Sequence, residues 1–145
     1  MIYQINNREK CATINEMINN SPVFDVLENR EVFKSAVFKR EAVHNTFLAH
    51  GVAAAHGQIK GLTKPRITFG VSKTGIEYNT EEKVNFLFVI ASGLKCRTDY
   101  VKSLASCLKY LRDENLRKEL LSKDLEKEQP SEKLKEFEDY LKQLN

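Results

Sequence analysis

The run VNFLFVIA, at residues 84–91, constrains the fold of this chain more than any other stretch. It is almost wholly apolar and rich in β-branched and aromatic residues, which favours a strand that is buried on both faces. The run is far too short to cross a bilayer as a helix. A chain of 145 residues, 41% of them hydrophobic, can build one core around such a strand, so we expect a single domain.

Helical periodicity is found on both sides of this strand. Apolar residues recur at helical spacing before and after it, and Asn29 and Ser131 are favourable residues for capping the start of a helix. The stretch between the first two helices, PVFDVLE, is compatible with a helix or a loop. The predicted helices cover residues 8–19, 29–41, 98–111, 114–127 and 131–144.

Strand patterns occupy the middle of the chain. Residues 52–56 are small and apolar, residues 66–72 alternate in strand fashion, and a turn at residues 73–75 leads to a short strand at residues 76–78. Helices first, strands in the middle and helices last describe an α/β fold: a single-domain sandwich with a central mixed β-sheet flanked by helices on both faces. The density of charge over residues 112–145 favours a partly detached, solvated helical tail.

Charge and cysteine content exclude several classes of protein. Lys and Arg number 23 against 20 Asp and Glu, giving a net charge of +3, and the two signs are interleaved, which argues against a nucleic-acid partner. No signal peptide or membrane-spanning run is present in the sequence, so we expect a soluble cytoplasmic protein without direct membrane insertion. Cys11, Cys96 and Cys107 have no metal-binding or redox spacing and are expected to be free thiols.

The three histidines, His44, His50 and His56, lie within one short window. The stretch from Glu41 to His56 holds no cysteine and has Glu41 as its one carboxylate, so we expect neither a metal nor a cofactor. His44 and His50 are interpreted as polar surface residues. His56 ends the small run VAAAH and precedes a glycine, so we expect its imidazole to stand at a strand end with little steric cover, as a nucleophilic or phosphoryl-accepting histidine requires.

Arg40 is the second candidate for chemistry, because it closes an apolar helix just before the loop that leads to His56. A planar guanidinium can hold two phosphoryl oxygens at once, and phosphoryl transfer depends mainly on positioning and charge stabilisation. The alternative is a helix C-terminal charge that interacts with the macrodipole. No Walker loop, dinucleotide fingerprint, nucleophile elbow or zincin motif is present in the sequence.

Read together, Arg40-Glu41, Thr46, Gly51 and His56 resemble the signature of the type-2 enzyme IIA domains of the bacterial phosphoenolpyruvate-dependent sugar phosphotransferase system (PTS). In that family a helix ends in Arg-Glu, a turn follows, and a strand presents the phosphorylated histidine. The order RITFGVS, GIEYN, VNFLFVIAS and LASCLKYLRD also resembles the family. The resemblance implies one domain over residues 1–145, with a core over 28–122 and a variable C-terminal helical extension over 123–145.

The resemblance also implies roles for five residues. His56 would accept a phosphoryl group from the histidine-containing phosphocarrier protein HPr, and Arg40 would hold the phosphoryl oxygens. Thr46 would help shape the turn, and Gly51 would allow close backbone approach. Tyr100 takes the position of a second family histidine in an ungapped alignment, and Asp99 takes it if one residue is skipped. The sequence departs from the family at Phe47 to Ala49, where the family has Gly-x-Gly, and at Ala55, where it has proline.

Three functions are compatible with these residues. The first is a phosphoryl-accepting IIA protein that acts in nitrogen-regulatory signalling, with a regulatory target protein as partner. The second is a fructose- or mannitol-type IIA that relays phosphate to a IIB domain for sugar uptake. The third is a IIA-like binding module that is not phosphorylated.

Overall fold

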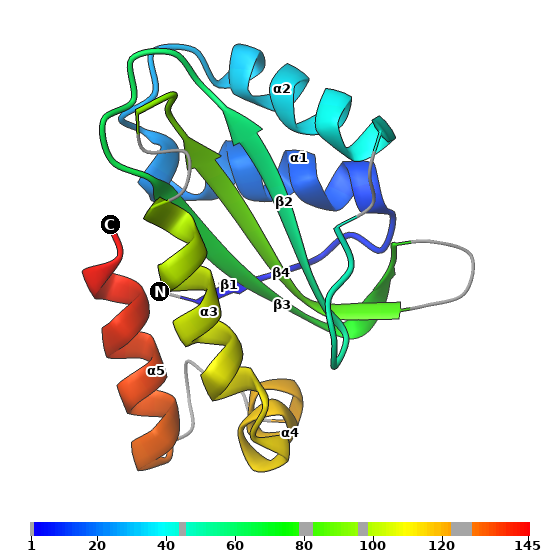
Figure 1. Ribbon diagram of the computed structural model, residues 1–145. Coiled ribbons are helices and arrows are strands. Elements are labelled where there is room, and N and C mark those ends of the chain that lie inside the picture. The colour runs from blue at the N-terminus through cyan, green and yellow to red at the C-terminus, as the bar shows by residue number, and fades with distance from the viewer. Residues whose placement is uncertain (1, 44–45, 79–82, 96–98, 123–128) are drawn as a thin grey trace.

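The computed structural model describes residues 2–43, 46–78, 83–95, 99–122 and 129–145. Its sheet has four strands in the order β1-β3-β4-β2 (Figure 1). Their bounds are β1 Ile2–Gln4, β2 Val52–Gln58, β3 Arg66–Glu77 and β4 Lys83–Ser92. The helices are α1 Lys10–Asn20, α2 Arg30–Val43, α3 Asp99–Leu111, α4 Glu114–Ser122 and α5 Glu132–Gln143, with a short 3-10 helix, η1, at Pro22–Phe24.

The strand predicted from VNFLFVIA is β4, and it lies inside the sheet. It runs antiparallel to β3 and parallel to β2, while β1 runs parallel to β3. The sheet is therefore mixed, as predicted. Alternate β4 side chains enter two separate cores, Phe86, Phe88 and Ile90 on one face and Leu87 and Val89 on the other, which confirms burial on both faces.

Helices cover both faces of this sheet, which confirms the predicted sandwich. Residues of α1, η1 and α2 build one core, and residues of α3, α4 and α5 build the other (Figure 1). The predicted caps are also present: the Asn29 side chain accepts hydrogen bonds from the backbone N–H groups of Glu31 and Val32, and the Ser131 side chain accepts one from that of Leu134. The last part of the helix predicted over 114–127 lies outside the described residues.

The strand pattern over residues 66–78 was only partly predicted. Instead of two strands joined by a turn at residues 73–75, β3 is one strand whose register against β4 shifts between Val71 and Ile76. The Ser72 hydroxyl accepts the Gly75 N–H at 3.0 Å, and Gly75 has φ +92°. The glycine that indicates a turn thus forms an irregularity within a continuous strand. The strand β1 was not predicted, because three residues are too few for a periodic pattern.

The prediction of a detached C-terminal tail is wrong. Leu116, Leu120, Leu134, Phe137 and Leu141 of α4 and α5 are buried in the same core as the sheet. The charged residues of these helices lie on the solvent side, and the opposite face of each helix is apolar. A high count of charges therefore does not show that a helix is detached. The C-terminal helical extension therefore completes one of the two cores.

The apolar stripe predicted for α3 is only partly buried. Leu111 is in the core, but Val101 is 51% exposed, and Cys107 is buried instead. Cys11 and Cys107 are free thiols, as predicted, while Cys96 lies outside the described residues. None of the helices in the described part of the chain is long and apolar enough to cross a membrane.

Candidate functional site

His56 lies on β2, two residues before the end of the strand, opposite Ile90 of β4. The expectation of a poorly covered imidazole is wrong, because the residue is only 6% exposed. The small residues that precede His56 do not shield it, but a helix distant in sequence does. The ring of Tyr100, at the start of α3, stacks on the imidazole with 4.5 Å between ring centroids. Tyr100, and not the exposed Asp99, is therefore the residue that faces His56.

The two ring nitrogens of His56 have different surroundings. Nε2 lies 2.6 Å from the hydroxyl of Ser92, the last residue of β4, and Ser92 is fully buried. Nδ1 is buried and has no hydrogen-bond partner among the described residues. Sequence reasoning missed Ser92, since only the register of β2 against β4 brings it beside His56.

Arg40 lies in the last turn of α2 and, with His56, lines an open hollow of about 410 Å³. Lys39 and Val43 of α2 and the end of β2 complete this hollow. Burial and, secondarily, the positive charge of Arg40 lower the pKa of His56 to about 4. The imidazole is consequently neutral at pH 7, the form that has a lone pair for nucleophilic attack.

The contact between α2 and β2 that forms this hollow depends on Gly57. A Cβ atom at this position would lie 2.8 Å from Cγ2 of Val37 and 3.2 Å from Cε1 of Phe33. The first distance is shorter than carbon atoms tolerate and the second is tight, so a side chain at this position would push α2 away from β2. The glycine next to His56 thereby sets the distance between the imidazole and the helix that carries Arg40.

Thr46 and Gly51 shape the segment that leads into β2. The Thr46 hydroxyl donates a 2.7 Å hydrogen bond to Glu41, whose carboxylate is also paired with Lys10 at 2.9 Å. Gly51 has φ +72°, and its carbonyl accepts the N–H groups of two β4 residues. His50 precedes it with φ 61° and is exposed, as expected of a polar loop residue. His44 lies outside the described residues.

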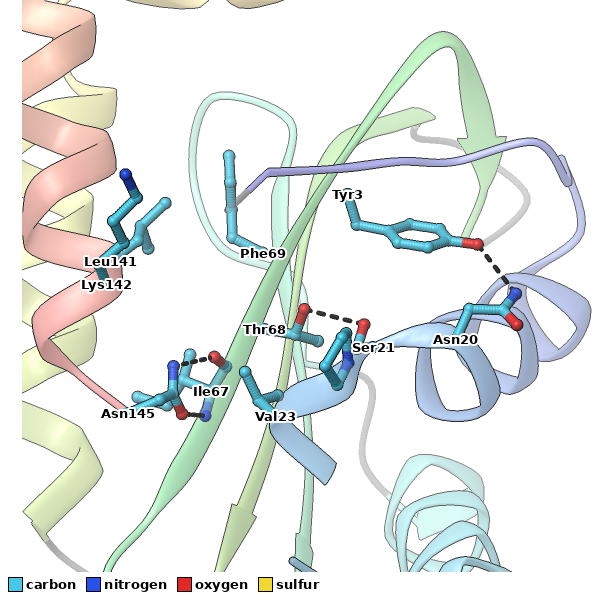
Figure 2. Close-up of a pocket in the computed structure, with 11 residues that line it drawn as sticks. Tyr3, Asn20, Ser21, Val23, Ile67, Thr68, Phe69, Leu141, Lys142 and Asn145 are labelled. Carbon is cyan, nitrogen blue, oxygen red and sulfur yellow. Dashed lines mark hydrogen bonds between the residues drawn. The ribbon is translucent and has the colours of Figure 1, made fainter. Parts of the chain in front are cut away.

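A second hollow, of about 400 Å³, lies at the opposite edge of the sheet, between β1, β3 and the end of α5 (Figure 2). Several of its polar side chains are paired with one another. Asn20 donates to the Tyr3 hydroxyl at 3.0 Å, and the Ser21 and Thr68 hydroxyls share a 3.1 Å hydrogen bond. Asn145 pairs with the backbone of β3 through both ends of its side-chain amide (Figure 2). None of the predicted site residues lines this hollow.

The fold is an α/β sandwich with an open hollow beside a buried histidine, and comparison with known proteins identifies its family. The sequence model of one protein family, described as phosphoenolpyruvate-dependent sugar phosphotransferase system, EIIA 2, matches residues 3–129. The chain belongs to this family. The predicted resemblance is thereby confirmed, and the chain is assigned to a phosphotransferase system.

Individual relatives come from sugar-specific and regulatory branches. The chain is 28% identical over 124 residues, 84% of its length, to the PTS system fructose-specific EIIABC component of Bacillus subtilis (strain 168), and it spans only 20% of that protein. Its fold is similar to nitrogen regulatory protein IIA-Ntr from Neisseria meningitidis, with TM-score 0.73, 15% identity and coverage of 96% and 91% of the two chains. It is also similar to mannitol enzyme IIA from Escherichia coli, solved in complex with phosphorylated mannitol enzyme IIB, with TM-score 0.64, 17% identity and coverage of 94% and 92%.

Proposed function

We propose that the chain accepts a phosphoryl group from HPr on His56. The observation that carries this proposal is an imidazole that is neutral at pH 7 and lines the same hollow as Arg40. Membership in a phosphotransferase family supports the same assignment. In the proposed step, a ring nitrogen of His56 forms a bond to phosphorus while the bond between phosphorus and the donor nitrogen breaks, and the donor nitrogen keeps that electron pair.

Arg40 and Tyr100 would contribute to this step in different ways. Arg40 is exposed at the hollow, where its guanidinium is able to hold two oxygens of the arriving phosphoryl group. Tyr100 stacks on the imidazole and so restricts the orientation of its plane. Phosphoryl transfer gains most from such positioning and charge stabilisation, because the transferred group needs little other chemical help.

For the role of the phosphorylated chain, we propose regulation of a target protein, in the manner of the nitrogen-regulatory branch. Tyr100 supports this role because it takes the position of a second histidine in the family pattern. A tyrosine ring lacks the basic nitrogen with which a second imidazole would assist rapid onward transfer. The fold similarity to IIA-Ntr is compatible with this reading.

The second candidate function is relay of the phosphoryl group to a IIB domain for fructose or mannitol uptake. The 28% identity between this chain and the fructose-specific relative favours this second function. The mannitol structure offers a model for the partner, since there the IIA protein is bound to phosphorylated IIB.

The decisive experiment is incubation of the protein with phosphoenolpyruvate, enzyme I and HPr. We expect an acid-labile, base-stable phosphoryl group on the wild type and none on His56→Ala. A wild type that stays unlabelled at every HPr concentration would leave the third function, a IIA-like binding module that is not phosphorylated. Adding a fructose IIB domain then separates the first two functions: rapid loss of label to IIB supports relay, and retention of label supports regulation.

Substitution of Arg40 tests the second site residue. We expect Arg40→Ala to slow labelling by roughly tenfold or more, equivalent to about 1.4 kcal/mol in the barrier. Arg40→Lys keeps the charge but lacks the planar fork, so its rate should lie between the other two. Lys39→Ala is the matched control, because it removes a neighbouring cation from the same hollow. Equal rates for Lys39→Ala and Arg40→Ala would assign Arg40 a general charge effect only.

A further inference from the structure

The two ring nitrogens of His56 are not equally available for attack on phosphorus. Nδ1 is buried and has no hydrogen-bond partner among the described residues, so no phosphoryl group can reach it without rearrangement of the core. Nε2 is the other nitrogen, and the Ser92 hydroxyl lies 2.6 Å from it. Nε2 is the nitrogen that movement of one side chain, Ser92, would free, so the reaction at His56 is placed at Nε2.

The Ser92 hydroxyl lies where the phosphorus atom would have to be. A hydrogen-bond partner of a ring nitrogen lies along the direction of its N–H bond or lone pair. A nitrogen–phosphorus bond forms along that same direction and is shorter than the 2.6 Å between Nε2 and Oγ. Phosphorus and the Ser92 oxygen cannot both be present there, so the Ser92 side chain must rotate away before the bond forms.

The unequal surroundings also select a tautomer of the neutral ring. With the proton on Nε2, the N–H donates to Ser92 Oγ and every ring N–H group is paired. With the proton on Nδ1, the ring has a buried N–H without an acceptor among the described residues. A buried unpaired donor is strongly disfavoured, so the first tautomer predominates. In this tautomer, Nε2 has no free lone pair.

We infer that Ser92 is a positioning residue that holds His56 in a non-nucleophilic resting state, by accepting the Nε2 proton in a hydrogen bond and occupying the path of the phosphoryl group. This regulation of the site rests on the proposed function of His56. For transfer to occur, Ser92 rotates away and the ring proton shifts from Nε2 to Nδ1, which leaves a lone pair on Nε2. This lone pair forms the bond to phosphorus while the bond to the donor nitrogen breaks, and Nδ1 then releases its proton to water. The departing donor nitrogen takes up one proton, so one proton and one phosphoryl group are exchanged.

The tautomer is measured directly by 15N NMR of the imidazole rings at pH 7. The chain has three histidines, and the His56 signals are assigned by their loss in His56→Ala. In the wild type we expect Nε2 to carry the proton. Ser92→Ala removes the acceptor and should shift the population toward the Nδ1 tautomer, whereas Ser92→Thr retains a hydroxyl and should restore the wild-type shifts.

Ser72→Ala is the matched control. Ser72 is a fully buried serine on the neighbouring strand β3, and its hydroxyl accepts the N–H of Gly75. This substitution removes a buried hydroxyl of the same kind away from His56. It should leave the His56 nitrogen shifts unchanged, so a change common to both variants would indicate a general loss of structure.

The rate is measured with phosphoramidate, a small donor that requires no partner protein. Ser92→Ala should label roughly three- to tenfold faster than the wild type, which corresponds to the loss of one hydrogen bond that stabilises only the resting state. Ser92→Thr should label at the wild-type rate or more slowly. A wild type with the proton on Nδ1, or a Ser92→Ala variant that labels no faster, would overturn the inference.

The outcomes also separate this inference from the proposed function. Labelling by phosphoramidate with the expected ratio, but none by HPr, would disprove HPr as donor and support the role of Ser92. If neither donor labels the chain, carbethoxylation of His56 by diethylpyrocarbonate replaces phosphorylation as the measure of Nε2 reactivity. Faster carbethoxylation of Ser92→Ala, with the expected tautomer shift, then supports the resting state, and equal rates refute it.

Discussion

His56 links the chemistry of the site to the stability of the protein through pH. Its pKa is lowered to about 4, mainly by burial and further by the charge of Arg40, while an unfolded histidine titrates near 6.5. Between these values the unfolded chain binds a proton that the native state does not. Stability is therefore lost as pH falls through this window. Because of His56, we expect the free energy of unfolding to be about 2 kcal/mol lower at pH 5 than at pH 7.

Urea unfolding of the wild type and His56→Gln at pH 7 and pH 5 measures this cost. The difference in unfolding free energy between the two pH values should be smaller in His56→Gln by about 2 kcal/mol. His44 and His50 are present in both proteins, so their contributions cancel. The same pH difference in both would mean that His56 titrates normally.

The sequence predicts which residues lie near His56 better than it predicts the burial and hydrogen bonds of His56. Arg40 and Tyr100 both lie beside His56, and both positions follow from the family pattern around the histidine. The burial of His56 and its contact with Ser92 could not be predicted. The burial depends on the packing of Tyr100 from α3. The Ser92 contact depends on the pairing register of two strands separated by more than 30 residues, which the whole sheet sets.

At the scale of elements, Gly57 links strand β2 to helix α2. An alanine methyl group at this position would overlap the Val37 side chain of α2 and lie tightly, at 3.1 Å, against the Val37 backbone nitrogen, so the helix itself must shift slightly. We expect Gly57→Ala to destabilise the fold by about 1–3 kcal/mol. Because α2 carries Arg40, we also expect labelling per folded molecule to slow by roughly tenfold. Urea unfolding and HPr-dependent labelling measure the two effects.

Gly70→Ala is the control for this prediction. Gly70 lies on β3, away from the hollow that Arg40 lines. A Cβ atom at this position would lie 2.8 Å from side-chain atoms of Ile5 and Met17. This variant should also lose stability, but its labelling rate per folded molecule should equal that of the wild type. If Gly57→Ala labels as fast as Gly70→Ala, the close packing of α2 is not needed to position Arg40.

The elements that were predicted correctly have strong local patterns, and those that were not depend on distant partners. The strand β4 and the helices α1, α2 and α5 follow from apolar periodicity and capping residues in their own sequences. The strand β1 pairs with Phe69 to Val71, more than 60 residues away in the sequence, and no local pattern marks it. The irregularity at Gly75 remains part of β3 because β4 continues beside it.

At the scale of the whole molecule, the chain builds two cores, and its C-terminal helix completes one of them. Phe137 of α5 is fully buried and contacts Phe69 of β3 at 5.2 Å and Tyr110 of α3 at 5.3 Å between ring centroids. Charge density over this segment indicated a detached tail, because a count of charges takes no account of the face on which they lie. The sheet, α3 and α5 meet at this one ring, so its removal should affect the whole domain.

We therefore expect Phe137→Ala to lower the free energy of unfolding by about 3–5 kcal/mol, through loss of apolar burial and creation of a cavity. Lys135→Ala, an exposed position on the same helix, should change stability by less than about 0.5 kcal/mol. Urea unfolding followed by far-UV circular dichroism measures both. A single cooperative transition that shifts as a whole in Phe137→Ala would show that α5 unfolds with the sheet. A small effect, or a separate early transition, would mean instead that α5 unfolds independently of the domain that carries His56.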